Sequence, residues 1–555
     1  MPLKAFVRLL KKPSSSRLLI FFLLATIAFV HYLSYGFHLP TTYQARDLNR
    51  ALDLFQGHFT WPGPELSGGG RLPGPFYYWL LALPLSVSTS VESPLIFLYL
   101  MSGIAAAIVW YFLETTFSRA VGLAGYFLFL NSVAIRTNIT SYWNPSYSIA
   151  LLVLVIGLRL KFPKAMPRRF LVVSGLLCGL SLQLHMTTIL VWLPLALVGF
   201  WSGEGTLRDR AKGFLIFSLA AAAPLVPYFI WEMTNQAPDI SMNRVSSGAS
   251  SLLQPLAFVN DNVVAAGKTF ATVLQDLFGT DLFLLVAVIS LFVFRRNPFA
   301  GNRFLVAAFF VSALFLPYLG YEASLLRYTL PFFLLLVIAL AIATGPVVER
   351  FPIAIAVLAV AYVLLLSRVD FRVLVHELTG PRVLLQMALA ACVVPLLVSK
   401  LSGQRRKAGL LLAVLFLSTI AHAVLDRHAP TAFGNEELKG VEIDVPEAKR
   451  MMKSVVSRTN WPYDTFRERT VIWGVGHELD LSIVYEEELA KARRTPGSVS
   501  TPQREEYDGI LIVSKSPAED VELTEEGFRA MIAKRPRLGS FCATFRPPGL
   551  FSSAT

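Results

Sequence analysis

The sequence is poor in charge and in cysteine. Only 16% of its 555 residues are Asp, Glu, Lys or Arg, whereas 54% are apolar. The three cysteines, Cys178, Cys392 and Cys542, lie far apart and form no Cys-x-x-Cys pair, which excludes a disulfide framework and a thiolate metal site. The sequence also has no glycine-rich phosphate loop on a strand-helix turn and no soluble dinucleotide-binding unit. A chain with so much apolar and so little charged sequence is typical of a membrane protein.

The net charge of +13 does not indicate a nucleic-acid-binding protein. Up to Leu425 the chain has 32 basic and 16 acidic residues, and beyond it 18 basic and 21 acidic residues. The positive excess therefore lies entirely in the apolar part. Cytoplasmic loops of membrane proteins collect Lys and Arg, so the excess is better explained as an orientation signal.

Apolar runs of about 20 residues predict a polytopic helical membrane protein with about thirteen transmembrane helices. The first run, behind a basic segment, has no evident cleavage site and is interpreted as an uncleaved helix. The predicted spans are 17–37, 93–116, 120–137, 147–162, 169–185, 186–201, 211–232, 281–295, 303–320, 327–347, 352–367, 383–399 and 408–425.

The predicted topology places the N-terminus in the cytoplasm and the residues after the last span outside it. The loops assigned to the cytoplasm are richer in Lys and Arg than the outer ones, as this orientation requires. Residues 1–425 then form the membrane domain, with two long outer loops at 38–75 and 233–280. Residues 426–555 are charged and polar, and alternate strand-like runs such as 469–473 and 507–513 with helix-like runs, which predicts a small extracytoplasmic α/β domain.

The first outer loop contains an amphipathic helix with a candidate catalytic acid. Thr41 to Gln44 has the form of a capping box, and the apolar residues that follow repeat at helical spacing until Gly57. The other face carries Arg46, Asp47, Arg50 and Asp53. A carboxylate such as Asp47 at the water boundary could act as a base toward a lipid headgroup, although these charges could equally form a solvated helix face.

Several stretches, in their order along the chain, resemble the bacterial GT-C membrane glycosyltransferases related to protein O-mannosyltransferases and to the lipid A aminoarabinose transferase. The resemblance covers roughly residues 17 to 350 and includes Asp47 after the first span. The other stretches are Gly74-Pro75-Phe76-Tyr77-Tyr78-Trp79, Trp143-Asn144-Pro145-Ser146, Gln183-Leu184-His185, Trp231-Glu232 and Leu326-Arg327-Tyr328-Thr329-Leu330-Pro331.

The resemblance implies an inverting glycosyltransferase of the bacterial inner membrane. It would move a sugar from a polyprenyl-phosphate donor to a hydroxyl or phosphate of an envelope lipid, glycan or protein on the periplasmic face. Asp47 takes the place of the base. Arg327 is the first candidate to bind the donor phosphate, because a guanidinium at the end of a span can hydrogen-bond to two phosphate oxygens at once. Arg244 and Lys268 in the second long loop come next.

The remaining candidate substrate-binding residues each have a structural alternative. Arg46 and Arg50 flank the base, and Tyr77 and Tyr78 could form a stacking platform or an ordinary aromatic belt. Other candidates lie at the ends of spans, where they could instead pack, cap or anchor a helix: His185, Glu232, Arg327 and Tyr328.

Metal use and two other functions stay open at this point. No cofactor is certain, because relatives carry acidic pairs that are absent here, and a divalent cation would need oxygen ligands from Glu232, Glu322 or the substrate. The alternatives to a transferase are a lipid-linked saccharide transporter and a glycan polymerase or ligase. The near absence of charge inside the spans speaks against the transporter.

Overall fold

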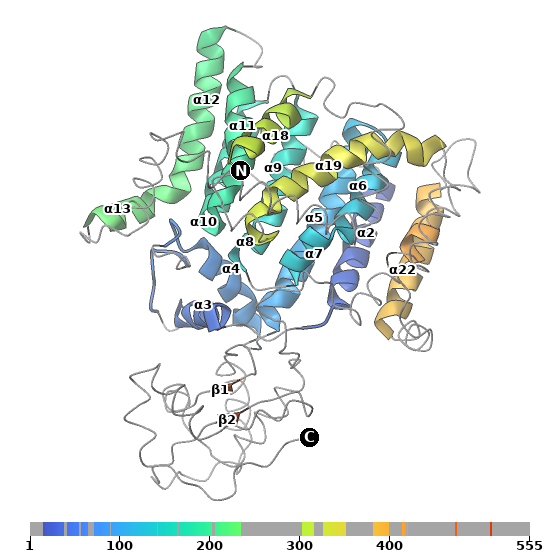
Figure 1. Cartoon of the computed structure of the whole chain (residues 1–555), viewed down its shortest axis with the longest axis horizontal. Coiled ribbons are helices and arrows are strands. Elements are labelled where there is room, and N and C mark those ends of the chain that lie inside the picture. The colour runs from blue at the N-terminus through green and yellow to red at the C-terminus, as the bar shows by residue number, and fades with distance from the viewer. Residues whose placement is uncertain are drawn as a thin grey trace, which may run out of the picture. The chain divides into compact units, whose positions relative to one another are not determined.

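The part of the chain that the structure, a computed structural model, describes is almost entirely helical (Figure 1). The structure describes residues 15–37, 42–54, 57–64, 71–88, 90, 92–140, 143–163, 166–201, 206–234, 302–315, 326–350, 381–398, 413–417, 419, 472–473 and 511–512. The longer helices are α2 (Ser15–Leu33), α3 (Thr42–Asp53), α4 (Phe76–Val87), α5 (Ser93–Thr116), α6 (Arg119–Asn131), α9 (Ile149–Lys161), α10 (Arg168–Leu184), α11 (Ile189–Trp201), α12 (Leu207–Ala222), α13 (Val226–Thr234), α18 (Arg303–Phe315), α19 (Leu326–Arg350) and α22 (Pro381–Val398). The shorter helical pieces are α7 (Val133–Ile139), α8 (Asn144–Tyr147), η2 (Met186–Thr188) and η3 (Ala223–Leu225).

Four of the described helical segments are long and apolar enough to cross a membrane: Ser15–Leu33, Ser93–Thr116, Leu207–Thr234 and Tyr328–Gly345. Shorter apolar helices accompany them at Phe76–Val87, Met186–Trp201, Arg303–Ser312 and Leu385–Pro395. The chain is therefore a helical membrane protein, as its composition predicts.

Helix α5 packs against both α2 and α6. Membrane helices associate through close van der Waals contact, because lipid offers little hydrophobic drive for one helix to meet another. Gly103 of α5 supplies such a contact: a Cβ atom there would lie 2.6 Å from the carbonyl oxygen of Ala25 in α2. The hydroxyl of Tyr126 in α6 donates to the carbonyl of Leu24 at 2.8 Å. Small residues and buried tyrosines thus hold the three helices together.

Helix α19 packs against α6 and α7, although nearly 200 residues separate them in sequence (Figure 1). Within its span, 78% of the residues of the window Tyr328–Gly345 are buried. A Cβ atom on Gly345 would overlap Val121 of α6, so glycine permits the close approach. This helix forms part of the packed interior of the helical unit.

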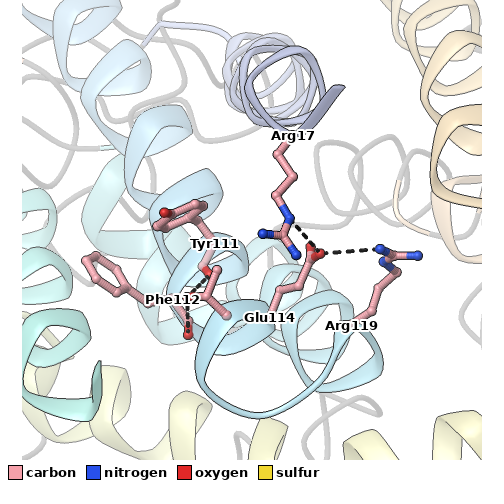
Figure 2. A network of polar contacts seen from close by, with 6 residues as sticks. Arg17, Tyr111, Phe112, Glu114 and Arg119 are labelled. Carbon is pink, nitrogen blue, oxygen red and sulfur yellow. Dashed lines mark hydrogen bonds and ion pairs between the residues drawn. The ribbon is translucent and has the colours of Figure 1, made fainter. Parts of the chain in front are cut away.

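At one end of this group, Glu114 of α5 joins α2 and α6 (Figure 2). Its Oε1 lies 3.8 Å from Nε of Arg17 and 3.5 Å from a terminal nitrogen of Arg119. Figure 2 shows both guanidinium groups pointing at the carboxylate from different helices. Because the Glu114 side chain is almost fully buried, the two arginines balance its charge and fix the register of three helices.

Apart from α3 and α4, which lie between the first two predicted spans, the described helices overlap predicted spans but break where side chains or proline dictate. The predicted span 120–137 is divided at Ser132, whose hydroxyl caps α7 by accepting from the Ile135 amide. The predicted span 211–232 begins earlier, at Leu207, because Thr206 and Asp209 form a capping box, and it is interrupted at η3, which contains Pro224. The predicted spans 281–295 and 352–367 lie outside the described residues.

The chain divides into two compact units. The first contains Met1–Gly36, Arg50–Ser88 and Ser93–Phe433, and the second contains Phe37–Asn49, Thr89–Glu92 and Gly434–Thr555. In the second unit, strands β1 (Ile472–Trp473) and β2 (Leu511–Ile512) pair in parallel. They fall within two of the predicted strand segments. Most of the predicted α/β domain, and its boundary at 425, lie outside the described residues.

Candidate active site

Helix α3 carries Asp47 on its buried side. The residues Gln44, Asp47, Leu48 and Ala51 are all buried, and their i, i+3, i+4 and i+7 spacing defines one face of the helix. The prediction that Asp47 lies on the solvated face was therefore wrong, because the buried face of α3 includes the polar side chains of Gln44 and Asp47 beside Leu48 and Ala51. Asp47 itself is only 5% exposed.

Two ion pairs between described residues lie on α3. Arg46 donates from Nε and from a terminal nitrogen to the same oxygen of Asp47, at 3.1 and 3.0 Å. Arg50 instead pairs at 3.8 Å with Asp53, and both of these side chains are exposed. The solvated-face interpretation thus holds for Arg50 and Asp53. Arg46 keeps a compensating positive charge beside the buried carboxylate of Asp47.

The aromatic run after Pro75 forms helix α4 and separates into buried and exposed rings. Tyr77 and Tyr78 are buried, whereas Trp79 is 45% exposed. The ring of Tyr77 lies edge to face on that of Tyr147, with centroids 5.6 Å apart. Trp79 instead lies near the exposed ring of Phe59 at 6.1 Å. Within one run, Trp79 suits a lipid-interface role, while the two tyrosines belong to the interior.

The junction after α10 orients His185. The backbone amide of Thr187 donates to His185 Nδ1 at 3.3 Å, and the Thr187 hydroxyl lies 2.6 Å from the same nitrogen. This engagement of Nδ1 places the proton of the neutral ring on Nε2. The imidazole ring also lies against the ring of Tyr328 at the start of α19, with centroids 5.0 Å apart. His185 is therefore a buried, oriented histidine that links two helix ends.

The same junction contacts the segment that enters α9. The side-chain amide of Asn144, at the start of α8, donates to the carbonyl of Leu184. Ser146 donates to the carbonyl of Asn138 at 2.5 Å, and Tyr147 donates to the carbonyl of Pro94 at 2.9 Å. These bonds tie α7, α8 and α10 to the start of α5.

Four of the stretches that carry the family resemblance thus meet in the first unit. The aromatic helix contacts the Trp143–Ser146 region through Tyr77 and Tyr147, that region contacts the Gln183–His185 junction through Asn144, and the junction contacts α19 through Tyr328. The result is a cluster of phenol and imidazole groups at helix ends, of which Tyr77, Tyr147 and His185 are buried and Tyr328 is half-buried. Such groups can hydrogen-bond and stack on a polar ligand at the edge of an apolar layer.

The remaining predicted site residues are described in part or not at all. Glu232 lies in α13, and its Oε1 is buried with no hydrogen-bond partner among the residues that the structure describes. Arg327 is the second residue of α19, but its side chain lies outside the described part. Arg244 and Lys268 also lie outside it. In the described part of the chain, no group of three or more His, Cys, Asp and Glu residues is placed to hold a metal ion.

Sequence reasoning missed Arg136. It is 3% exposed, and its guanidinium lies over the ring of Tyr35 at 5.3 Å. A buried arginine is costly in an apolar layer, and such residues commonly serve function. The signal was present, since Arg136 is the one charged residue in the apolar run from 120 to 139. The contact between Arg136 and Tyr35 joins α7 to the segment that follows α2.

The fold of this chain is similar to that of two solved structures of ArnT. The sequence matches no protein-family model and no curated protein. Its structure is similar to that of ArnT from Cupriavidus metallidurans in the apo state, with a TM-score of 0.54, 13% identity and coverage of 86% of this chain and 85% of that one. It is also similar to ArnT bound to undecaprenyl phosphate, with a TM-score of 0.52, 13% identity and coverage of 88% and 89%. The resemblance stated from the sequence is confirmed at the level of fold: the chain has the fold of ArnT, the lipid A aminoarabinose transferase of the GT-C family, over most of its length.

Proposed function

We propose that this protein is an inverting glycosyltransferase of the bacterial inner membrane. It transfers a sugar from a polyprenyl-phosphate donor to a hydroxyl or phosphate of an envelope lipid, glycan or protein on the periplasmic face. The single observation that carries the proposal is the shared fold with ArnT, one of whose structures is bound to undecaprenyl phosphate. The apolar helices, which suit a long prenyl carrier, support it.

Asp47 is the proposed base. In the reaction, the acceptor oxygen attacks the anomeric carbon while the bond from that carbon to the donor phosphate breaks on the opposite face. The acceptor proton passes to the Asp47 carboxylate, and polyprenyl phosphate leaves with the electron pair. The buried position of Asp47 and its ion pair with Arg46 support this role, because they hold a charged carboxylate away from bulk water.

The growing charge on the leaving phosphate requires cations and hydrogen-bond donors. Arg327 is the proposed main cation, and Arg244 and Lys268 are proposed to assist it. His185 contacts Tyr328, the residue that follows Arg327 in the sequence of α19, and both fit a supporting role on the donor. Tyr77 and Tyr78 are proposed to bound the sugar or the first prenyl units.

The test is the release of free polyprenyl phosphate when purified protein is incubated with polyprenyl-phosphate monosaccharides and candidate acceptors. Asp47→Asn should lower transfer by about 10²- to 10⁴-fold, the usual contribution of a positioned base. The matched control is Asp53→Asn, because Asp53 is an exposed aspartate on the same helix. Equal transfer by the two variants would remove Asp47 from the reaction, and a wild-type protein that moves the lipid without releasing the carrier would be a transporter.

A further inference from the structure

One side of α10 is fitted to the helix α12 and to the break that follows it. Gly175, Gly179 and Gln183 are spaced four residues apart and so share a face. A Cβ atom on Gly175 would lie 2.5 Å from the carbonyl oxygen of Phe217, and one on Gly179 would overlap the carbonyl of Ala221. The two backbones therefore approach as closely as glycine allows. Gln183 continues this face at the point where α12 gives way to η3.

The side-chain amide of Gln183 makes two hydrogen bonds to backbone groups from different parts of the chain. Its Nε2 donates to the carbonyl of Pro224 in η3 at 2.6 Å. Its Oε1 accepts from the amide of Phe76 at 3.2 Å. Phe76 is the first residue of α4, and the first amides of a helix have no partner within the helix. Gln183 thus supplies the hydrogen-bond acceptor that the first amide of α4 lacks within its own helix, although the two residues are 107 positions apart in sequence.

Gly74 is shaped to leave room for this contact. Its φ of +134° is one that side chains rarely adopt, and a Cβ atom there would overlap the amide group of Gln183. The Gly74-Pro75 turn and Gln183 therefore fit each other. Neither feature is explained by the packing of α4 alone.

We propose that Gln183 is a positioning residue that locks the start of α4, and with it Tyr77 and Tyr78, to the junction between α12 and α13. The link from this placement to donor binding rests on the proposed function. The amide suits the task because it donates and accepts at once, while glutamate can only accept when ionised and methionine can do neither. All three side chains have nearly the same length, so the substitutions change chemistry more than volume.

The first arm of the test measures amide hydrogen exchange in the full-length protein in detergent micelles. Gln183→Met should speed exchange in the peptide that contains Phe76, because this amide loses its acceptor, whereas Gln183→Glu should retain protection there. The matched control is Gln386→Met, because Gln386 of α22 is also buried in a helix, and its side-chain amide has no hydrogen-bond partner in the described residues. Unchanged exchange at Phe76 in Gln183→Met would overturn the proposal.

The second arm measures the affinity for undecaprenyl phosphate by native mass spectrometry. Gln183→Met should weaken binding by about fivefold to tenfold, as expected for the loss of one or two buried hydrogen bonds. The affinity of Gln183→Glu should lie closer to that of wild type than the affinity of Gln183→Met does. The affinity of Gln386→Met should equal that of wild type. Faster exchange at Phe76 with unchanged affinity would refute the link to the donor. If the wild-type protein neither binds undecaprenyl phosphate nor transfers sugar, the proposed function fails, and the exchange arm still decides whether Gln183 positions α4.

Discussion

The Glu114 cluster offers a quantitative test of how burial changes the worth of an ion pair. The perturbation is Glu114→Gln, which keeps the shape of the side chain and removes its charge. The Glu114 side chain is 6% exposed, while those of Arg17 and Arg119 are 45% and 19% exposed. Removing one partner of a fully buried pair costs about 3–5 kcal/mol. Because one arginine is largely solvated and both distances exceed 3.2 Å, we expect a smaller loss of about 1–3 kcal/mol.

The pair of Arg50 and Asp53 is the matched control. Its distance of 3.8 Å equals that between Arg17 and Glu114, but its side chains are 55% and 40% exposed. Asp53→Asn should therefore change stability by only about 0–0.5 kcal/mol. Among the arginines, Arg119→Gln should destabilise the protein more than Arg17→Gln. The Arg119 side chain is 19% exposed and that of Arg17 is 45% exposed, so water screens the interaction of Arg119 with Glu114 less.

The assay is thermal inactivation in detergent, followed by fluorescence-detected size-exclusion chromatography. Unfolding of a protein of this size is expected to be irreversible, so apparent midpoints are compared at one heating time. The Glu114→Gln midpoint should fall by several degrees and that of Asp53→Asn should stay near wild type. Equal shifts in the two variants would refute the argument that burial, and not distance, sets the contribution of these pairs.

Two further changes probe packing and donor binding. Gly103→Ala should lower the same thermal midpoint, by an amount that corresponds to about 1–3 kcal/mol, because the new methyl group meets backbone atoms of α2; a midpoint at or above wild type would contradict the close contact of α2 and α5. Arg327→Ala should weaken donor binding in the transfer assay, and an unchanged apparent donor affinity would remove Arg327 from the site.

The sequence predicted a helical membrane protein and several of its described helices, because an apolar run of about 20 residues has few alternatives to a spanning helix. The predicted span 93–116 coincides with α5. The breaks within spans were missed, since they depend on local features such as the cap at Ser132, although Pro224 was a visible warning. Hydropathy averages over such features.

The site was predictable in composition but not in orientation. The run Tyr77-Tyr78-Trp79 was identified, yet only the helix phase shows that the tyrosines are buried and the tryptophan is exposed. Asp47 was assigned to the wrong face because the buried face of α3 includes the polar residues Gln44 and Asp47, which an apolar pattern does not mark. The role of Gln183 was invisible, because it depends on contacts with Phe76 and Pro224 that no local pattern encodes.

The late position of α19 in the chain has a consequence for biosynthesis. Its partner α6 leaves the ribosome about 200 residues earlier. The surface of α6 around Val121 therefore lacks its packing partner in the bilayer until the segment that contains Gly345 has been synthesised and inserted. A nascent chain that ends before α19 would leave this surface facing lipid or insertion factors. We expect such fragments to be recognised by membrane quality control, whereas completion of α19 should confer protease resistance on helices made long before it.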